Sequence, residues 1–457
     1  MTKRLVTPPF PIATADGATR PMRRRALASL GGLAVMASGC GGSGGTGDLA
    51  GVGSGGTGAA FGFGMISGFG SIIVNGIKYD DSQASVTDDL GNRRELGELR
   101  LGMIVEIRGS ADDSTSLGTA NSVRILSELK GPVTRVTPSQ TTPGTGELVV
   151  LGTTVRVMST TFWQDASGLV GVVDGQIVEV WGFADRTSNT ITATRIEIKQ
   201  ASDNTATRLR GMVTELVPGI RIRVGGQQEG SGSQDFTLAN ATVAAGVRVG
   251  DLVKVQYTPS GTTKIATKVE VDTSAVLSNE TRVRAEGRIS QFTSKSNFKL
   301  EGLSVDASSA SFSDGLESQL ANGARVRVEG QMLGSKLKAS VVRFRDDAQS
   351  NSGSGSSGSG SSGSGSGSSN SGSSGGSSSS GSDDYGDEVK GVIVRFAGKE
   401  SFTVKDRANR EFNFDGSSAT GKDGGPLPSL GIGSPVQVKF TVQAFGLLKA
   451  NQIRLDT

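Results

Sequence analysis

The 457-residue sequence contains no histidine and a single cysteine, Cys40. Without histidine, the chain lacks a Ser-His-Asp triad and the side chain that most often transfers protons near neutral pH. One cysteine cannot form a disulfide within the chain, and no zinc site of Cys and His ligands can be built. Carboxylate chemistry is not excluded, but the sequence offers no motif for it.

Aromatic residues make up only 5% of the chain, and basic charge is hardly in excess, with 47 Lys and Arg against 44 Asp and Glu. Residues 1–39 hold six basic side chains and one acidic side chain, a net of +5. Since the whole chain carries +3, the rest carries −2. Such a chain has no basic surplus to attract phosphate backbones, so no nucleic-acid partner is expected.

The N-terminus has the pattern of an export signal. Three arginines, Arg23 to Arg25, precede a short run of small apolar residues that ends in Ala37-Ser38-Gly39-Cys40. We therefore predict a signal peptide at 1–39, with Met22 as an alternative start, and a Gly-rich tether at 40–59. The apolar run is too short to cross a bilayer as a helix.

The residues before Cys40 resemble a lipobox, with Ala37 in place of the usual leucine. The resemblance implies lipidation of Cys40 and an exported, lipid-anchored protein whose partner is a membrane. Gly41 after the cysteine implies release to the outer membrane, with the membrane face left open. The alternative is a stray thiol in a glycine-rich leader.

One strand pattern occurs five times: Gly-x-x-Val-x-Val, followed by Ala-x-x-Val-x-Val. The marker alanines of the first four copies are 73 residues apart, whereas the last step is 111 residues. The excess of 38 matches a Gly/Ser tract at 346–383. A constant period indicates tandem modules, at these positions: module 1, 60–127; module 2, 129–200; module 3, 207–272; module 4, 282–345; module 5, 387–457.

Each module offers five or six short strands in about 65 residues, with turn signals such as Asn75-Gly76 between them. We expect an all-β chain of five tandem, small antiparallel β-barrels that are OB-like, with a small sandwich as the alternative. The Gly/Ser tract predicts a disordered linker that lets module 5 move independently. Whether modules 1 to 4 stack or hang as separate beads is left open by the sequence.

The opening Gly-Phe-Gly-Ser-Ile-Ile-Val-Asn-Gly-Ile at 68–77 and the repeated strands resemble the bacterial family called domain of unknown function 5666. The resemblance covers most of 60–345 and 387–457 and is closest in module 1. It implies secreted or lipid-anchored proteins with tandem β domains, and it implies no established activity.

Two tryptophans are the candidate ligand contacts. Alternation places Trp181 on the same face as Glu179, away from the core of its module, where it could stack on a sugar ring. The alternative is that Trp181 covers a contact between modules. Trp163, beside Phe162, is a further candidate and is otherwise a core or loop residue. Acidic pairs such as Asp88-Asp89 fit no calcium loop and indicate solvated turns.

No catalytic residue, metal ligand or cofactor is predicted. We expect a non-enzymatic cell-envelope lipoprotein that presents repeated modules for scaffolding, adhesion or ligand binding, with an envelope protein or a polysaccharide as partner. One alternative is a polysaccharide-binding or small-ligand-binding protein centred on module 2. Another is an unrecognised carboxylate-dependent hydrolase, which requires two acidic residues in one cleft.

Overall fold

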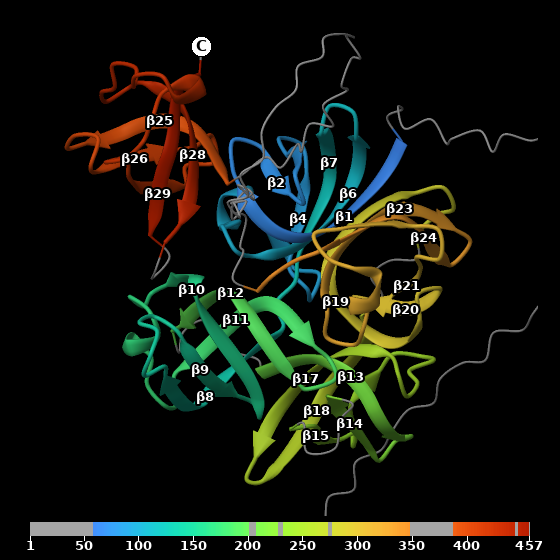
Figure 1. Ribbon diagram of the computed structural model, residues 1–457. Helices are drawn as coiled ribbons and strands as arrows, with labels where there is room; N and C mark the ends of the chain where they lie inside the picture. Colours follow the sequence, from blue (N-terminus) through green and yellow to red (C-terminus); the bar gives the residue numbers. More distant parts are fainter. Residues whose placement is uncertain are drawn as a thin grey trace, which may run out of the picture. The chain divides into compact units, whose positions relative to one another are not determined.

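The computed structural model describes residues 58–200, 207–226, 232–272, 277–347, 387–443 and 447–456. Within these ranges the chain consists of β-strands and four single-turn 3-10 helices (Figure 1). The predicted signal peptide, Cys40, nearly all of the tether and most of the Gly/Ser tract lie outside the described residues.

The strands recur in the same order in each module. Module 1 has β1 (Gly58–Gly68), β2 (Ile72–Val74), β3 (Ile77–Asp80), β4 (Ser85–Thr87), β5 (Arg93–Arg94), η1 (Leu96–Glu98), β6 (Ile104–Asp112) and β7 (Leu117–Ile125). Module 2 has β8 (Leu129–Pro138), β9 (Gly146–Val150), β10 (Thr153–Gln164), η2 (Leu169–Gly171), β11 (Ile177–Asp185) and β12 (Thr190–Lys199). Module 3 has β13 (Thr207–Val217), β14 (Arg221–Gly225), β15 (Gln234–Thr237), β16 (Thr242–Val243), β17 (Leu252–Ser260) and β18 (Thr263–Val271). Module 4 has β19 (Arg282–Ser294), β20 (Asn297–Leu300), β21 (Leu303–Asp306), β22 (Ser311–Ser313), η3 (Glu317–Gln319), β23 (Arg325–Leu333) and β24 (Lys336–Phe344). Module 5 has β25 (Glu388–Phe396), β26 (Phe402–Lys405), β27 (Glu411–Asp415), η4 (Lys422–Gly424), β28 (Pro435–Val442) and β29 (Leu448–Leu455).

Five strands in each module pair in one circuit. In module 1, β1 pairs with β2, β2 with β3, β3 with β7, β7 with β6, and β6 with β1. The β3–β7 pairing is parallel and the other four are antiparallel. Modules 2 to 5 repeat the circuit, with β10–β12, β15–β18, β21–β24 and β27–β29 as the parallel pairs. The all-β, OB-like character predicted from the sequence is confirmed.

The modules are not five separate barrels, and this part of the prediction is wrong. Three sheets are present: one of 13 strands, one of 11 strands and the closed barrel of module 5. In the first sheet β1 pairs in parallel with β19, joining modules 1 and 4. In the second, β8 pairs with β13 and joins modules 2 and 3. The opening strand of each of these modules therefore pairs through one edge with its own circuit and through the other edge with another module.

A β-bulge interrupts the pairing of the last two strands of every module at the same place. The strands concerned are β6, β11, β17, β23 and β28, each paired with the strand that follows it. The register shifts at Arg108/Gly109, Trp181/Gly182, Gln256/Tyr257, Glu329/Gly330 and Lys439/Phe440. A Cβ atom at Gly109 would lie 1.8 Å from the carbonyl oxygen of Thr119, so a side chain does not fit that bulge. The glycine that follows the repeated Val-x-Val pattern thus marks the bulge.

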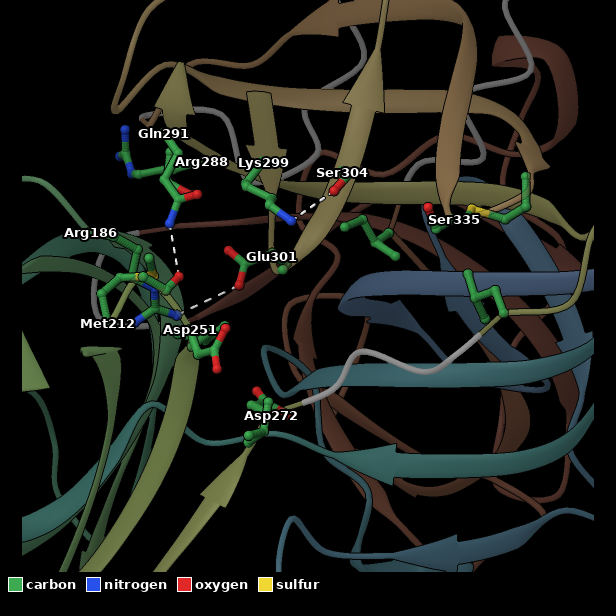
Figure 2. Close-up of a pocket in the computed structure, with 18 of the residues that line it drawn as sticks. Arg186, Met212, Asp251, Asp272, Arg288, Gln291, Lys299, Glu301, Ser304 and Ser335 are labelled. Atoms are coloured by element: carbon green, nitrogen blue, oxygen red, sulfur yellow. Dashed lines mark hydrogen bonds and ion pairs between the residues drawn. The ribbon is translucent and has the colours of Figure 1, made fainter. Parts of the chain in front are cut away.

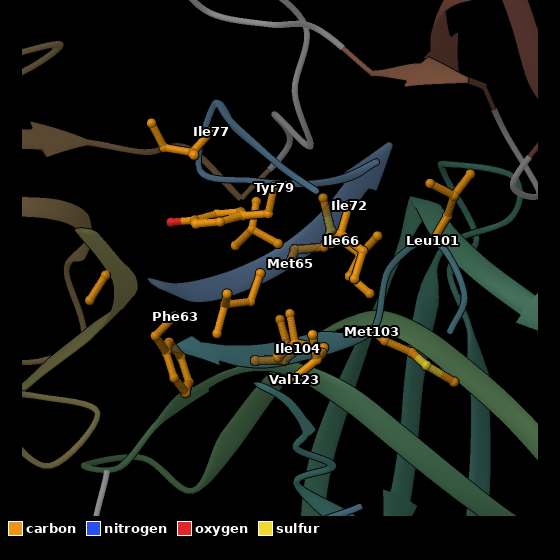
Figure 3. Packing of buried hydrophobic residues seen from close by; sticks show 14 of the residues in the cluster. Phe63, Met65, Ile66, Ile72, Ile77, Tyr79, Leu101, Met103, Ile104 and Val123 are labelled. Carbon is orange, nitrogen blue, oxygen red and sulfur yellow. The ribbon is translucent and has the colours of Figure 1, made fainter. Parts of the chain in front are cut away.

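The interior of module 1 shows why its opening strand alternates phenylalanine and glycine. Phe61 and Phe63 are both buried, and Figure 3 shows Phe63 among the packed side chains of the core. On the opposite face of β1, a Cβ atom at Gly64 would lie 2.5 Å from the Oδ1 atom of Asn75. Asn75 and Gly76 form the predicted hairpin turn between β2 and β3, with φ values of 53° and 79°. The Asn75 amide also donates to the carbonyl oxygen of Arg284 in module 4, at 3.0 Å.

Module 5 does not stand apart as the Gly/Ser tract predicts. Its strand β25 forms a parallel bridge with module 1, between Val389 and Phe69. Buried apolar residues of modules 1, 4 and 5 belong to one cluster, which also includes Phe162, Trp181 and Phe183 of module 2. Most buried apolar residues of modules 2 and 3 form a second cluster. The composition of a linker describes the linker alone and not the surfaces at its two ends, so sequence reasoning missed this contact.

Candidate functional site at the module junction

An ionic cluster centred on Arg210 connects the modules. Arg210 lies on β13, and its side chain is 1% exposed. Its Nη1 atom lies 2.6 Å from the Oε1 atom of Glu128 and 2.9 Å from the Oε2 atom of Glu301. Its Nε atom donates to Asp272. Glu128 lies between modules 1 and 2, Asp272 follows β18, and Glu301 is in the β20–β21 turn.

Two further arginines extend this Arg210 cluster. Arg186, in module 2, lies 2.7 Å from Glu128 and 3.6 Å from Glu301. Arg124, on β7 of module 1, lies 3.5 Å from Asp272 and 2.6 Å from Glu106. Modules 1, 2, 3 and 4 therefore each contribute a side chain, and the alternating charges satisfy one another away from water.

Two carboxyl groups of the cluster, those of Asp272 and Glu128, have lowered pKa values. Burial by itself would raise the pKa of Asp272, but Arg210, Arg124 and Lys254 lower it to about 2. The pKa of Glu128 is likewise lowered, because Arg186 and Arg210 outweigh its burial. Carboxyl groups with lowered pKa values are ionised near neutral pH, so Asp272 and Glu128 are suited to pairing with the arginines rather than to donating a proton.

A cavity of about 570 Å³ lies beside this cluster, lined by modules 2, 3 and 4 (Figure 2). Its size is in the range of small-molecule pockets, which favour domain interfaces. Its apolar lining is Met212, Leu252, Val271, Leu277, Leu303 and Met332.

Lys299 is the cation of the cavity wall that has no acidic partner. Its Nζ atom donates to the Oγ atom of Ser304 at 2.7 Å, and no carboxylate of the described chain lies within 4.0 Å of it. Arg288 is instead bonded to Thr192 and Asp347. Asp251, also on the wall, accepts a hydrogen bond from the backbone of Arg248 at 2.8 Å. The cavity thus combines an apolar lining with one available ammonium group.

A second cavity, of about 660 Å³, is more polar and contains Trp181. Trp181 points away from the core of its module but is only 2% exposed, so its ring is not open for a sugar to stack on it. Its outward face is covered: Trp181 and Phe162 belong to the apolar cluster of module 1 rather than to that of module 2. The Nζ atom of Lys199 lies 5.7 Å from the centre of the indole ring. The alternative interpretation, a contact between modules, is the one that fits.

The structure also locates two of the other three residues that the sequence analysis singled out, Trp163, Asp89 and Cys40. Trp163 is half-buried and packs against the apolar cluster of modules 2 and 3. Asp89 does not lie in a solvated turn, since it is 5% exposed and 3.2 Å from the Nε atom of Arg208. Burial raises the pKa of Asp89 in spite of Arg208 and Lys254. Cys40 lies outside the described residues.

Sequence reasoning missed the Arg210 cluster. Its members stand singly in the chain, and no local pattern distinguishes them from the many solvated charges of the strands. The structure offers no group of three or more His, Cys, Asp or Glu side chains placed to hold a metal ion, as far as residues 58–200, 207–226, 232–272, 277–347, 387–443 and 447–456 are concerned. Over the same ranges, no helix has the length and hydropathy to span a membrane.

Comparison with known proteins gives a family model that matches two segments and an alignment with one solved structure. No curated protein matches the chain. One solved structure, described as drosophila Unr CSD456, aligns with 48% of this chain and 97% of its own length at 16% identity, with a TM-score of 0.12. The model of the family described as Domain of unknown function (DUF5666) matches residues 130–197 and 286–343. These segments lie in modules 2 and 4 rather than in module 1, and over them the chain resembles this family, as its repeated strands predict.

Proposed function

We propose that the chain is a non-enzymatic, lipid-anchored protein of the cell envelope that presents its β modules as a scaffold for a partner. The observation that carries the proposal is the Arg210 cluster, in which four modules share buried charges. Side chains joined in this way hold modules 1 to 4 in one arrangement instead of as loose beads. A fixed arrangement suits repeated display of surfaces, whereas an active site needs to be built only once.

The anchor is tested by fractionating cells that express the full chain or its Cys40→Ser variant. We expect the full chain in the detergent-extracted membrane fraction and the variant in the soluble fraction. A Ser38→Ala variant, which keeps small residues before Cys40, should fractionate like the unchanged chain. A full chain that is soluble without detergent would contradict the anchor. Protease treatment of intact cells then separates surface display from periplasmic residence.

A second function, binding of a small amphipathic anion, is favoured by the cavity between modules 2, 3 and 4. Its apolar lining would hold a hydrocarbon portion, and Lys299 would meet an anionic head group. Octanoate is a suitable probe, with binding followed by calorimetry. We expect Lys299→Gln to weaken binding at least tenfold, Lys299→Arg to retain it, and Lys336→Gln to leave it unchanged. Equal binding by Lys299→Gln would exclude the head-group contact.

The remaining alternatives have less support. A sugar cannot stack on the Trp181 ring while module 1 covers it. A carboxylate-dependent hydrolase needs a protonated and an ionised carboxyl group that meet in one cleft. On the wall of the first cavity, the pKa of Asp272 is lowered. On the wall of the second cavity, burial raises the pKa of Asp89, but its carboxyl group is paired with Arg208.

A further inference from the structure

The tetrapeptide Gly68-Phe69-Gly70-Ser71 occurs once in the chain, between β1 and β2 of module 1. The scaffold proposal assigns it no role. Its backbone is bonded to module 5: the Phe69 amide donates to the carbonyl oxygen of Glu388 at 2.7 Å, and the Lys390 amide donates to that of Phe69 at 2.8 Å. These two bonds form the parallel bridge between Phe69 and Val389. The segment therefore adds one strand-like contact to the edge of another module.

The two glycines allow this close approach. A Cβ atom at Gly68 would lie 2.4 Å from the carbonyl oxygen of Glu388. A Cβ atom at Gly70 would lie 2.4 Å from the Cβ atom of Lys390, and the φ of Gly70 is +119°. Any larger residue at either position would push the backbone of module 5 away.

Side chains on both modules complete the contact. Phe69 is fully buried, and its ring lies 5.5 Å from that of Phe412 and 3.3 Å from the guanidinium carbon of Arg410. The Nζ atom of Lys78 lies 3.0 Å from the Oε1 atom of Glu388, which is also buried. An aromatic side chain packed under a cation, with a buried ion pair beside it, is typical of a specific interface.

We infer that residues 68–71 are a docking site for module 5, and that a second copy of this chain can supply the module that docks. Each of these contacts joins a residue before the tract 348–386 to a residue after it. A closed chain and a pair of chains that exchange module 5 would thus make identical contacts. They differ in concentration alone, because a covalent link between two binding partners supplies an effective concentration on the order of mM. Dilute chains are then closed, and crowded chains exchange.

The docking is tested on the full chain with a protease site inserted into the Gly/Ser tract. After cleavage, we expect the fragment that contains module 5 to co-elute with the remainder on gel filtration. Phe69→Ala should release it, whereas Phe312→Ala, a change to a half-buried phenylalanine of module 4, should not. Release from the unchanged chain, or retention with Phe69→Ala, would overturn the inference.

A charge exchange separates lost docking from lost folding. Lys78→Glu and Glu388→Lys should each release the fragment, and the double variant should retain it. Failure of the double variant to retain the fragment, with both single variants folded by circular dichroism, would show that the ion pair does not hold the modules together and would count against the site.

Exchange between copies needs two tagged chains, one tagged before module 1 and the other after module 5. The chains are mixed at about 1 mM and cleaved, and the first tag is captured. We expect the module 5 fragment of the second chain on the beads, and its absence when the first chain carries Phe69→Ala. Recovery of only the first chain's own module 5 would refute supply by a second copy.

Discussion

At the scale of residues, Arg210 is the side chain on which the junction depends most. Replacement by methionine keeps the volume roughly but leaves Asp272, Glu128 and Glu301 buried without their shared cation. We expect the free energy of unfolding to fall by about 3–5 kcal/mol. Urea denaturation followed by circular dichroism measures this. Arg395→Met is the matched control, since the Arg395–Glu411 pair is exposed and should contribute no more than about 1 kcal/mol. Equal losses in the two variants would mean that the cluster is not a source of stability.

Trp181 shows how far sequence reasoning reaches at this scale. The alternation of β11 correctly separates Trp181 from the core of its own module, since its apolar contacts belong to the cluster of module 1. The sequence left open whether this side chain contacts a ligand or another module, because its burial depends on a neighbouring module and a strand pattern contains no information about neighbours. The prediction that Asp89 lies in a solvated turn is wrong for the same reason. The turn is present where the acidic pair predicts it, but Arg208 of module 3 covers the Asp89 side chain.

At the scale of elements, we expect that a side chain at the bulge glycine of β23, Gly330, disturbs the strand locally. In Gly330→Ala, the new Cβ atom would lie 2.1 Å from the carbonyl oxygen of Lys338 on β24. We expect a loss of about 1–3 kcal/mol, seen as faster hydrogen exchange in β23 and β24. Gly431→Ala is the control, because nothing lies within 4 Å of its Cβ position. Unchanged exchange in Gly330→Ala would mean that the strands shift freely to accept a methyl group.

The elements themselves are largely encoded locally. The period, the Asn75-Gly76 turn and the Val-x-Val strands follow from side chains a few residues apart, so the sequence predicts them. The bulge is less accessible, since Tyr257 and Phe440 replace the glycine in modules 3 and 5 without removing the register shift. A glycine rule alone would therefore have found the bulge in three modules.

At the scale of the whole molecule, the joining of modules 1 with 4 and 2 with 3 is what the sequence hides. The four residue pairs between β1 and β19 join residues that are more than 200 positions apart in the sequence. A repeat makes every opening strand look alike, so it does not determine which pairs meet. The side-chain contacts between modules together determine which modules pair, and the Arg210 cluster is one set of these contacts.

Two buried carboxyl groups, that of Asp272 in the Arg210 cluster and that of Glu286 on β19, predict how the molecule responds to acid. The pKa of Asp272 is about 2 in the folded chain against an ordinary value of 3.8, and that of Glu286, paired with Arg325, is about 2 against 4.5. Because both values are lower in the folded chain, ionisation of these groups favours folding. Their contribution is present above about pH 4.5 and is lost as the pH falls toward 2. We expect the stability of the full chain to fall steeply over this window in urea denaturation. Asp272→Asn should be less stable than the unchanged chain at pH 7, with the difference narrowing toward pH 2. A difference that stays constant with pH would show that Asp272 acts through its shape and not through its charge.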